Sequence, residues 1–227
     1  QNEAQISQYM FYRESYSPAS IAENDLMTVS GLNRLQWVSF PRAPKTFYFT
    51  FNTPLTLGSK RNTVGLIFSN DQAGAYLTQA VNFQYAYKFP LASGHLSIGT
   101  NIGFISQTIA GDSLHVVDSD YHDDGDVIIP TKSVNDVAFD IALGLYYWDN
   151  TKYFGLSLVH LPEPILDLES IMITYIPRMA YFTGGYIFQM LNPKYVLTPS
   201  LLVKTDFVTF QAEANVNLEY NQKYWGG

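Results

Sequence analysis

The sequence predicts an all-β protein, an antiparallel up-and-down transmembrane β-barrel, and three patterns lead to this fold class. Apolar and polar side chains alternate from Leu77 to Phe89, with Gln79 as the exception, and a period of two is typical of a strand with one apolar and one polar face. Strands of globular domains are usually about 5 to 6 residues long, so this run has the length of a tilted strand crossing a bilayer. The same alternation recurs in further segments along the chain, and the connections between these segments alternate between short and long.

About ten segments show the alternation, and each is predicted as a strand. They are residues 27–37, 46–52, 63–69, 77–89, 96–104, 137–147, 154–160, 180–190, 195–204 and 210–220. Small and polar residues on one face of 96–104, among them Ser97 and Gly99, suit a narrow or filled interior. Asp140 lies opposite an apolar row, and we expect it to point inward because a carboxylate facing lipid is unfavourable.

The connections give a second signal. The short ones are 90–94, 149–152, 191–194 and 221–223, and the long ones are 107–135 and 161–179. Residues 54–62 form a longer turn on the short side. Outer-membrane barrels have short periplasmic turns and longer outer loops. This predicts an N-terminus in the periplasm and an acidic loop that faces outward.

The composition restricts the class of protein further. Tyrosine (17) outnumbers phenylalanine (15) among 227 residues, as suits rings at a membrane interface. Mean hydropathy is −0.04, and no stretch approaches the roughly 18 apolar residues of a spanning helix. The net charge of -7 argues against binding nucleic acid, which requires clustered Lys and Arg. The chain has no cysteine, which excludes disulfides and thiolate chemistry, and no cofactor is predicted.

A soluble β-sandwich or lipid-binding barrel would also alternate. Its polar faces would carry more charge, and its apolar faces would be mixed aliphatics rather than rows that end in aromatics next to the turns. We therefore favour the membrane barrel over the soluble alternative.

The chain divides into two parts. Residues 1–24 form an N-terminal segment, periplasmic or lumen-plugging, and 25–227 form the barrel. Gln1 follows no basic start or apolar signal core, so we expect a mature N-terminus. The chain stops at residues 225–227, which resemble the opening of another strand, and a barrel has to close. We expect an incomplete C-terminus and about fourteen strands in the full protein.

Two clusters are candidates for a metal-binding or a catalytic site. Asp118, Asp120, Asp124 and Asp126 could hold a hard cation, but the EF-hand pattern fails because Thr131 stands where its closing Glu belongs, so a solvated acidic loop is favoured. His95 and Ser97 share a face, a spacing that a lipase in a barrel wall could use. That face is the polar one and offers no third catalytic group, so no enzymatic activity is predicted.

Charged residues on the predicted inner faces are the remaining candidates. Lys88, Asp140, Glu213 and Glu219 are expected to face the lumen, where they could line a pore or form a sealing network. A barrel of about ten to fourteen strands is too narrow to assume an open channel, and both possibilities stay open.

Several short motifs resemble one known family. Residues 5–11 read QISQYMF and residues 16–19 read YSPA. Together they resemble the opening of the PorP/SprF family of the type IX secretion system, with its Gln-Phe-Ser-Gln-Tyr-Met-like run and Asn-Pro-Ala element. Residues 34–37 (RLQW) resemble the family's Arg-x-Gln-Trp region. Residues 199–200 (PS) resemble an element of a later strand in the family. Ser17 stands where Asn is usual.

The resemblance implies a non-enzymatic barrel in the outer membrane of a Gram-negative bacterium, part of the type IX export and gliding machinery. It implies partners among the periplasmic ring and lipoprotein components, or a role in anchoring exported surface proteins. Tyr9, Met10, Phe11 and Tyr12 are the candidates for a partner contact or a plug inside the barrel. The alternative function is an outer-membrane porin or substrate-selective transporter.

Overall fold

One large antiparallel sheet dominates the computed structural model, which describes residues 5–57, 60–111, 132–168 and 172–227. The described residues begin with the 3-10 helices η1 (Tyr9–Phe11), η2 (Arg13–Ser15) and η3 (Pro18–Ala22). The strands are β1 (Thr28–Leu35), β2 (Lys45–Leu57), β3 (Lys60–Ala73), β4 (Tyr76–Leu91), β5 (Gly94–Ile109), β6 (Val134–Trp148), β7 (Lys152–Val159), β8 (Ile165–Leu168), β9 (Met172–Tyr175), β10 (Met179–Tyr186), β11 (Phe188–Gln189), β12 (Tyr195–Thr205), β13 (Phe210–Tyr220) and β14 (Tyr224–Gly226).

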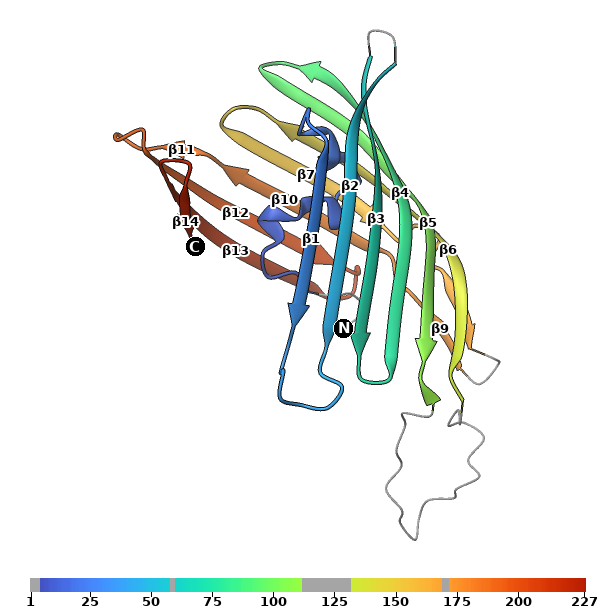
Figure 1. The fold of residues 1–227 in the computed structure, drawn as a ribbon. Helices are drawn as coiled ribbons and strands as arrows, with labels where there is room; N and C mark the ends of the chain where they lie inside the picture. The colour runs from blue at the N-terminus through green and yellow to red at the C-terminus, as the bar shows by residue number, and fades with distance from the viewer. Residues whose placement is uncertain (1–4, 58–59, 112–131, 169–171) are drawn as a thin grey trace.

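The sheet is a meander. Its strand order is β1-β2-β3-β4-β5-β6-β7-β10-β12-β13-β14, with β11 paired to β12, and β8 and β9 form a separate hairpin. All pairings are antiparallel, as between Gln84 and Asn101 on β4 and β5. This confirms the predicted all-β antiparallel architecture. The end strands β1 and β14 are not paired to each other in the described residues, and Figure 1 shows the sheet curled but open between them.

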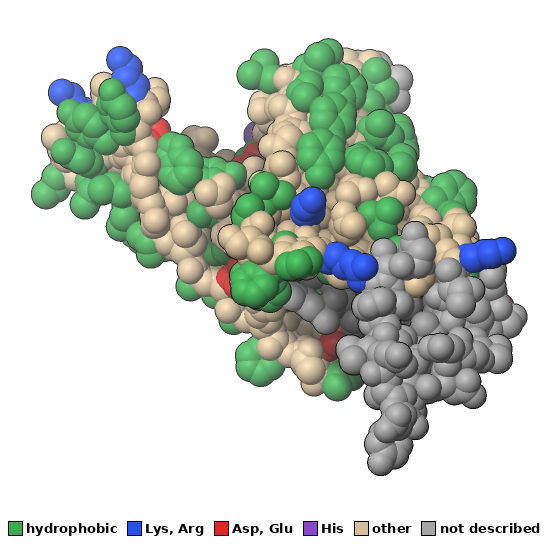
Figure 2. Space-filling view, turned by 60° about the horizontal axis from the view of Figure 1, so that its bottom comes forward, with side chains coloured by type: hydrophobic (Ala, Val, Ile, Leu, Met, Phe, Trp, Pro, Cys, Tyr) green, Lys and Arg blue, Asp and Glu red, His purple; other side chains and the backbone are tan. Residues whose placement is uncertain are grey.

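Alternation places two different chemistries on the two faces. On the convex face, Phe83, Ile102 and Phe104 are 52%, 46% and 59% exposed, and Figure 2 shows hydrophobic side chains spread over the outer surface, with few charged ones. On the concave face, Gln84 and Ser97 are fully buried. Burial is thus inverted relative to an ordinary soluble sheet, with polar residues inside and large apolar residues outside.

No helix in the parts of the chain that the structure describes is long and apolar enough to cross a membrane.

The structure corrects three of the predicted boundaries. Most of 54–62 belongs to β2 and β3, and Pro54 pairs with Thr63 within the ladder, because a proline can stay in a strand where its nitrogen is not needed as a donor. The segment 161–179 contains the hairpin β8–β9 rather than an unstructured loop. The strand predicted over 180–190 ends at Tyr186, and a short strand β11 follows.

The turn between β6 and β7 depends on one carboxylate. Asp149 Oδ1 accepts hydrogen bonds from the Thr151 hydroxyl (2.7 Å), the Thr151 amide (2.7 Å) and the Lys152 amide (3.0 Å). The Tyr147 hydroxyl donates to Oδ2 at 3.2 Å. These donors, those of Thr151 foremost, lower the pKa of the Asp149 carboxyl to about 2.

We expect this turn to loosen only at low pH. A carboxyl with a depressed pKa in the folded state stabilises the fold fully above its unfolded pKa, here near the usual 3.8, and that contribution is lost as pH falls toward 2. NMR titration of the Asp149 carboxyl, with hydrogen exchange of the Thr151 amide, measures this. A midpoint at the ordinary aspartate value would contradict the hydrogen-bonding scheme, and Asp149→Ala should lose the protection of Thr151 at every pH.

Candidate functional site

The described residues at the start of the chain, 5–25, cover the concave face of the sheet; they extend one residue past the predicted boundary at 24 and are called the N-terminal segment from here on. In Figure 1 its 3-10 helices lie inside the curl, between β1 and the strands β7 and β10. Its contacts reach from Thr50 on β2, which donates to Glu14 at 3.2 Å, to Ser200 on β12, which lies 3.1 Å from the Tyr9 hydroxyl. Residues Ser17 to Ala22 are all buried. The segment therefore bridges strands that lie far apart in the sheet.

Two glycines of the sheet allow the segment to come close. A Cβ atom added to Gly99 would lie 2.5 Å from the Cα and the backbone nitrogen of Ala19, and one added to Gly144 would lie 3.1 Å from Pro18. Next to this contact the Ser97 hydroxyl donates to the Ala19 carbonyl at 2.6 Å. Any side chain at position 99 would push η3 off the sheet, so these residues form a fitted seat.

Arg13 anchors the middle of the segment. Its guanidinium donates to Glu23 at 2.9 Å and to the Tyr146 hydroxyl, and it lies over the Tyr153 ring at 4.3 Å. The Tyr146 hydroxyl also donates to Glu23 at 3.0 Å. A buried charge is tolerated only when paired and hydrogen-bonded, and here the pairing joins the middle of the segment and its C-terminal end to β6 and β7.

A second ion pair fixes the end of the segment. Lys88 of β4 is 8% exposed and donates to Asp25, and Arg61 lies 3.3 Å from the same carboxylate. The hydrogen bond from Lys88 lowers the pKa of the Asp25 carboxyl. Glu14 behaves in the opposite way, because burial raises the pKa of its carboxyl despite the bond from Thr50. The two acids thus respond to their surroundings in opposite directions.

The four N-terminal candidates do not form one surface. Tyr9, Met10 and Tyr12 are buried, at 2%, 9% and 4% exposure. Tyr9 donates to the Glu213 carbonyl at 3.3 Å, and the Tyr12 ring lies 5.8 Å from that of Tyr48. Phe11 is 51% exposed and its ring lies 4.7 Å from that of Trp225. Three of these side chains are buried against the sheet, whereas Phe11 packs on Trp225 of β14 and stays half exposed.

The four charged candidates lie on the concave side. Lys88 and Asp140 are buried, and Glu213 and Glu219 are half-buried. Glu213 lies 3.8 Å from the Lys204 amine. Asp140 Oδ2 lies 2.8 Å from His160 Nδ1.

His160 departs from the strand pattern. It has the parity of Phe154 and Leu156, which are 46% and 51% exposed on the convex side, whereas His160 is only 8% exposed. β7 ends at Val159, and His160 adopts a left-handed backbone with φ of 54°. This turn carries the imidazole over to Asp140.

The lipase alternative is not supported by the geometry. It requires His95 and Ser97 on the convex face, but Ser97 is fully buried against the N-terminal segment, where its hydroxyl contacts the Ala19 and Tyr146 carbonyls at 2.6 and 3.2 Å. His95 is exposed and stacks on Trp148 at 5.4 Å. The hydroxyl thus binds backbone rather than an imidazole.

Nothing in the described residues bears on the predicted acidic loop. Asp118, Asp120, Asp124 and Asp126 are outside the described residues. Within the described ranges, no group of three or more His, Cys, Asp or Glu side chains is placed to hold a metal ion.

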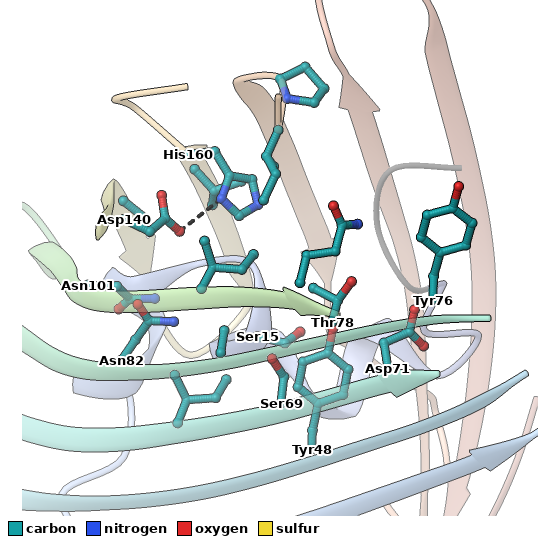
Figure 3. A pocket seen from close by; sticks show the side chains of 18 of the residues that line it. Ser15, Tyr48, Ser69, Asp71, Tyr76, Thr78, Asn82, Asn101, Asp140 and His160 are labelled. Carbon is teal, nitrogen blue, oxygen red and sulfur yellow. Dashed lines mark hydrogen bonds and ion pairs between the residues drawn. The ribbon is translucent and has the colours of Figure 1, made fainter. Parts of the chain in front are cut away.

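A pocket of about 450 Å³ remains beside the N-terminal segment. The sheet supplies most of its wall, Ser15 comes from η2, and residues 174–177 come from β9 and the chain that follows it. Figure 3 shows Asp140 and His160 at one end and Asp71 with Tyr76 at the other. The lining is rich in hydroxyl, amide and carboxylate groups.

These features define a class, an antiparallel β-protein with an apolar convex surface and a polar concave face filled by its own N-terminus. The family described as type IX secretion system membrane protein PorP/SprF matches residues 1–227. The chain belongs to this family, which confirms the resemblance. No curated protein matches the sequence at a significant level.

We expect Gly99→Val to release the N-terminal segment. Two methyl groups at this seat would overlap the Ala19 backbone, and overpacking costs typically about 1–3 kcal/mol. Trypsin cleavage after Arg13, which is protected when the segment is seated, should become faster. Gly31→Val on β1 is the matched control, because nothing lies within 4 Å of its added Cβ. Equal cleavage rates in the two variants would rule out the fitted seat.

Proposed function

We propose that this chain forms a non-enzymatic outer-membrane β-barrel of the type IX secretion system and acts through protein contacts. Membership of the PorP/SprF family supports a role in that system. The apolar convex face supports contact with lipid, since large exposed hydrophobic surfaces on a soluble monomer are unfavourable. In this arrangement the N-terminus lies in the periplasm and the long loops face outward.

One observation carries the proposal: the N-terminal segment occupies the concave face from β2 to β12. Its anchors are the glycine seat and the Arg13–Glu23 and Asp25–Lys88 pairs. We infer that the segment is a plug. A filled interior favours a rigid scaffold for partner proteins over a water-filled channel.

The partners we propose are periplasmic ring or lipoprotein components, exported surface proteins that the barrel anchors, or both. Phe11 is the accessible member of the N-terminal group, at 51% exposure, and suits a periplasmic contact. Gliding motility is the process in which such anchoring would be used.

A matched pair of variants tests the lipid-facing surface. Val216 is 53% exposed on the convex side of β13, and its neighbour Asn215 is half-buried on the concave side. In vesicles, Val216→Lys should lower the free energy of unfolding by about 2–4 kcal/mol if the site is near the bilayer midplane. Asn215→Lys should cost much less, because its ammonium faces the polar interior. Urea titrations compare the two, and equal losses would count against a lipid-facing convex surface.

Planar-bilayer recording and native purification separate the secretion role from the transporter alternative. We expect the wild type to conduct poorly and to copurify from native membranes with type IX components. Gly99→Val should conduct more than Gly31→Val, because only the former dislodges the plug. A wild type with stable ion-permeable openings and no copurifying secretion protein would favour the porin or transporter instead.

A further inference from the structure

The pocket lies between three parts of the chain. The hairpin β8–β9 packs inward, where Leu166 and Ile176 contact Ala80 and Ile105 on the concave face of β4 and β5. Ser15 of the N-terminal segment lines the other side. The pocket is therefore bounded by the sheet, the segment and the hairpin, and its volume lies within the range of small-molecule sites.

One end of the pocket is built from neighbouring strands in register. Tyr48 on β2 pairs with Ser69 on β3, and Asp71 on β3 pairs with Thr78 on β4. Asp71 Oδ1 accepts a hydrogen bond from Thr46 at 2.5 Å. Tyr76 lies two residues from Thr78 on β4 and also lines the pocket, and Figure 3 shows Asp71, Tyr76 and Tyr48 at the same end of it. A carboxylate at the end of a pocket that two tyrosines also line is suited to recognising an organic cation.

The charges around the pocket have one dominant sign. Asp71 and Asp140 are its carboxylates, and no Lys or Arg is among the described residues that line it. His160 hydrogen-bonds to Asp140 at 2.8 Å. Inside a curled sheet, where water is partly excluded, these carboxylates attract a positive ligand and repel anions.

We propose that this pocket binds an organic cation, an ammonium or guanidinium group that Asp71 engages directly while Asp140 adds its charge from the opposite end. The group could belong to a free amine or to a lysine or arginine side chain of a partner peptide. A bare metal ion fits less well, because no group of three ligating side chains lies within the described ranges. The inference does not depend on the secretion role, since the pocket lies in the folded chain itself.

A matched ligand pair tests the charge requirement on the full chain in detergent. Arginine amide and citrulline amide have nearly the same shape, but only the former carries a guanidinium. We expect arginine amide to bind with a Kd below about 1 mM, and citrulline amide at least tenfold more weakly, by calorimetry. A short arginine-containing peptide, measured in parallel, distinguishes the two sources: tighter binding than the free amide assigns the site to a peptide side chain.

Variants then locate the site. Asp71→Asn should weaken binding of arginine amide at least tenfold, and Asp140→Asn should weaken it less. Asp206→Asn is the control, because it removes a loop carboxylate that does not line the pocket. Circular dichroism, and the change in gel migration of each variant between unheated and heated samples, establish that the variant is folded. Equal binding of the two amides, or unchanged binding in Asp71→Asn, would overturn the proposal, whatever the outcome of the secretion experiments.

Discussion

The close approach of the Pro18-Ala19 backbone to Gly99 and Gly144 is the constraint on which the interior depends. Because β5 and β6 carry no side chain at Gly99 and Gly144, η3 comes near enough for the Ser97 hydroxyl to donate a hydrogen bond to the Ala19 carbonyl. With η3 in place, Arg13 reaches Tyr146 and Tyr153, and Asp25 reaches Lys88. The segment thereby replaces water as the hydrogen-bond partner of several groups on the polar concave face.

The strands could be predicted because their signal is local. A period of two assigns each side chain to a face from its neighbours alone, and the assignment of Ser97 and Asp140 to the inner face followed from that. His160 shows where the rule ends. Its left-handed backbone breaks the parity of β7, and nothing in the alternating pattern signals a reversal one residue after the strand.

The seating of the N-terminal segment could not be predicted in this way. Its 3-10 turns have no periodic pattern, and several of its bonds use backbone carbonyls, as where Ser157 donates to Tyr16 at 2.5 Å. Arg13 was not singled out from the sequence, although a lone arginine among aromatic residues is a hint of a buried pair. Closure of the barrel is a matter of how the edge strands β1 and β14 pair, and an alternating pattern within one strand does not indicate its partner.

The hydrogen bond between Tyr9 and Ser200 also has a consequence for the order of folding. It joins residues 191 positions apart in the chain. Contacts of such high sequence separation form late, since the entropy of closing the intervening loop has to be met first. The Tyr9 end of the N-terminal segment therefore reaches its place only after β12 has joined the sheet. Until then Tyr9 lacks the partners on β12 and β13 that bury it in the folded chain.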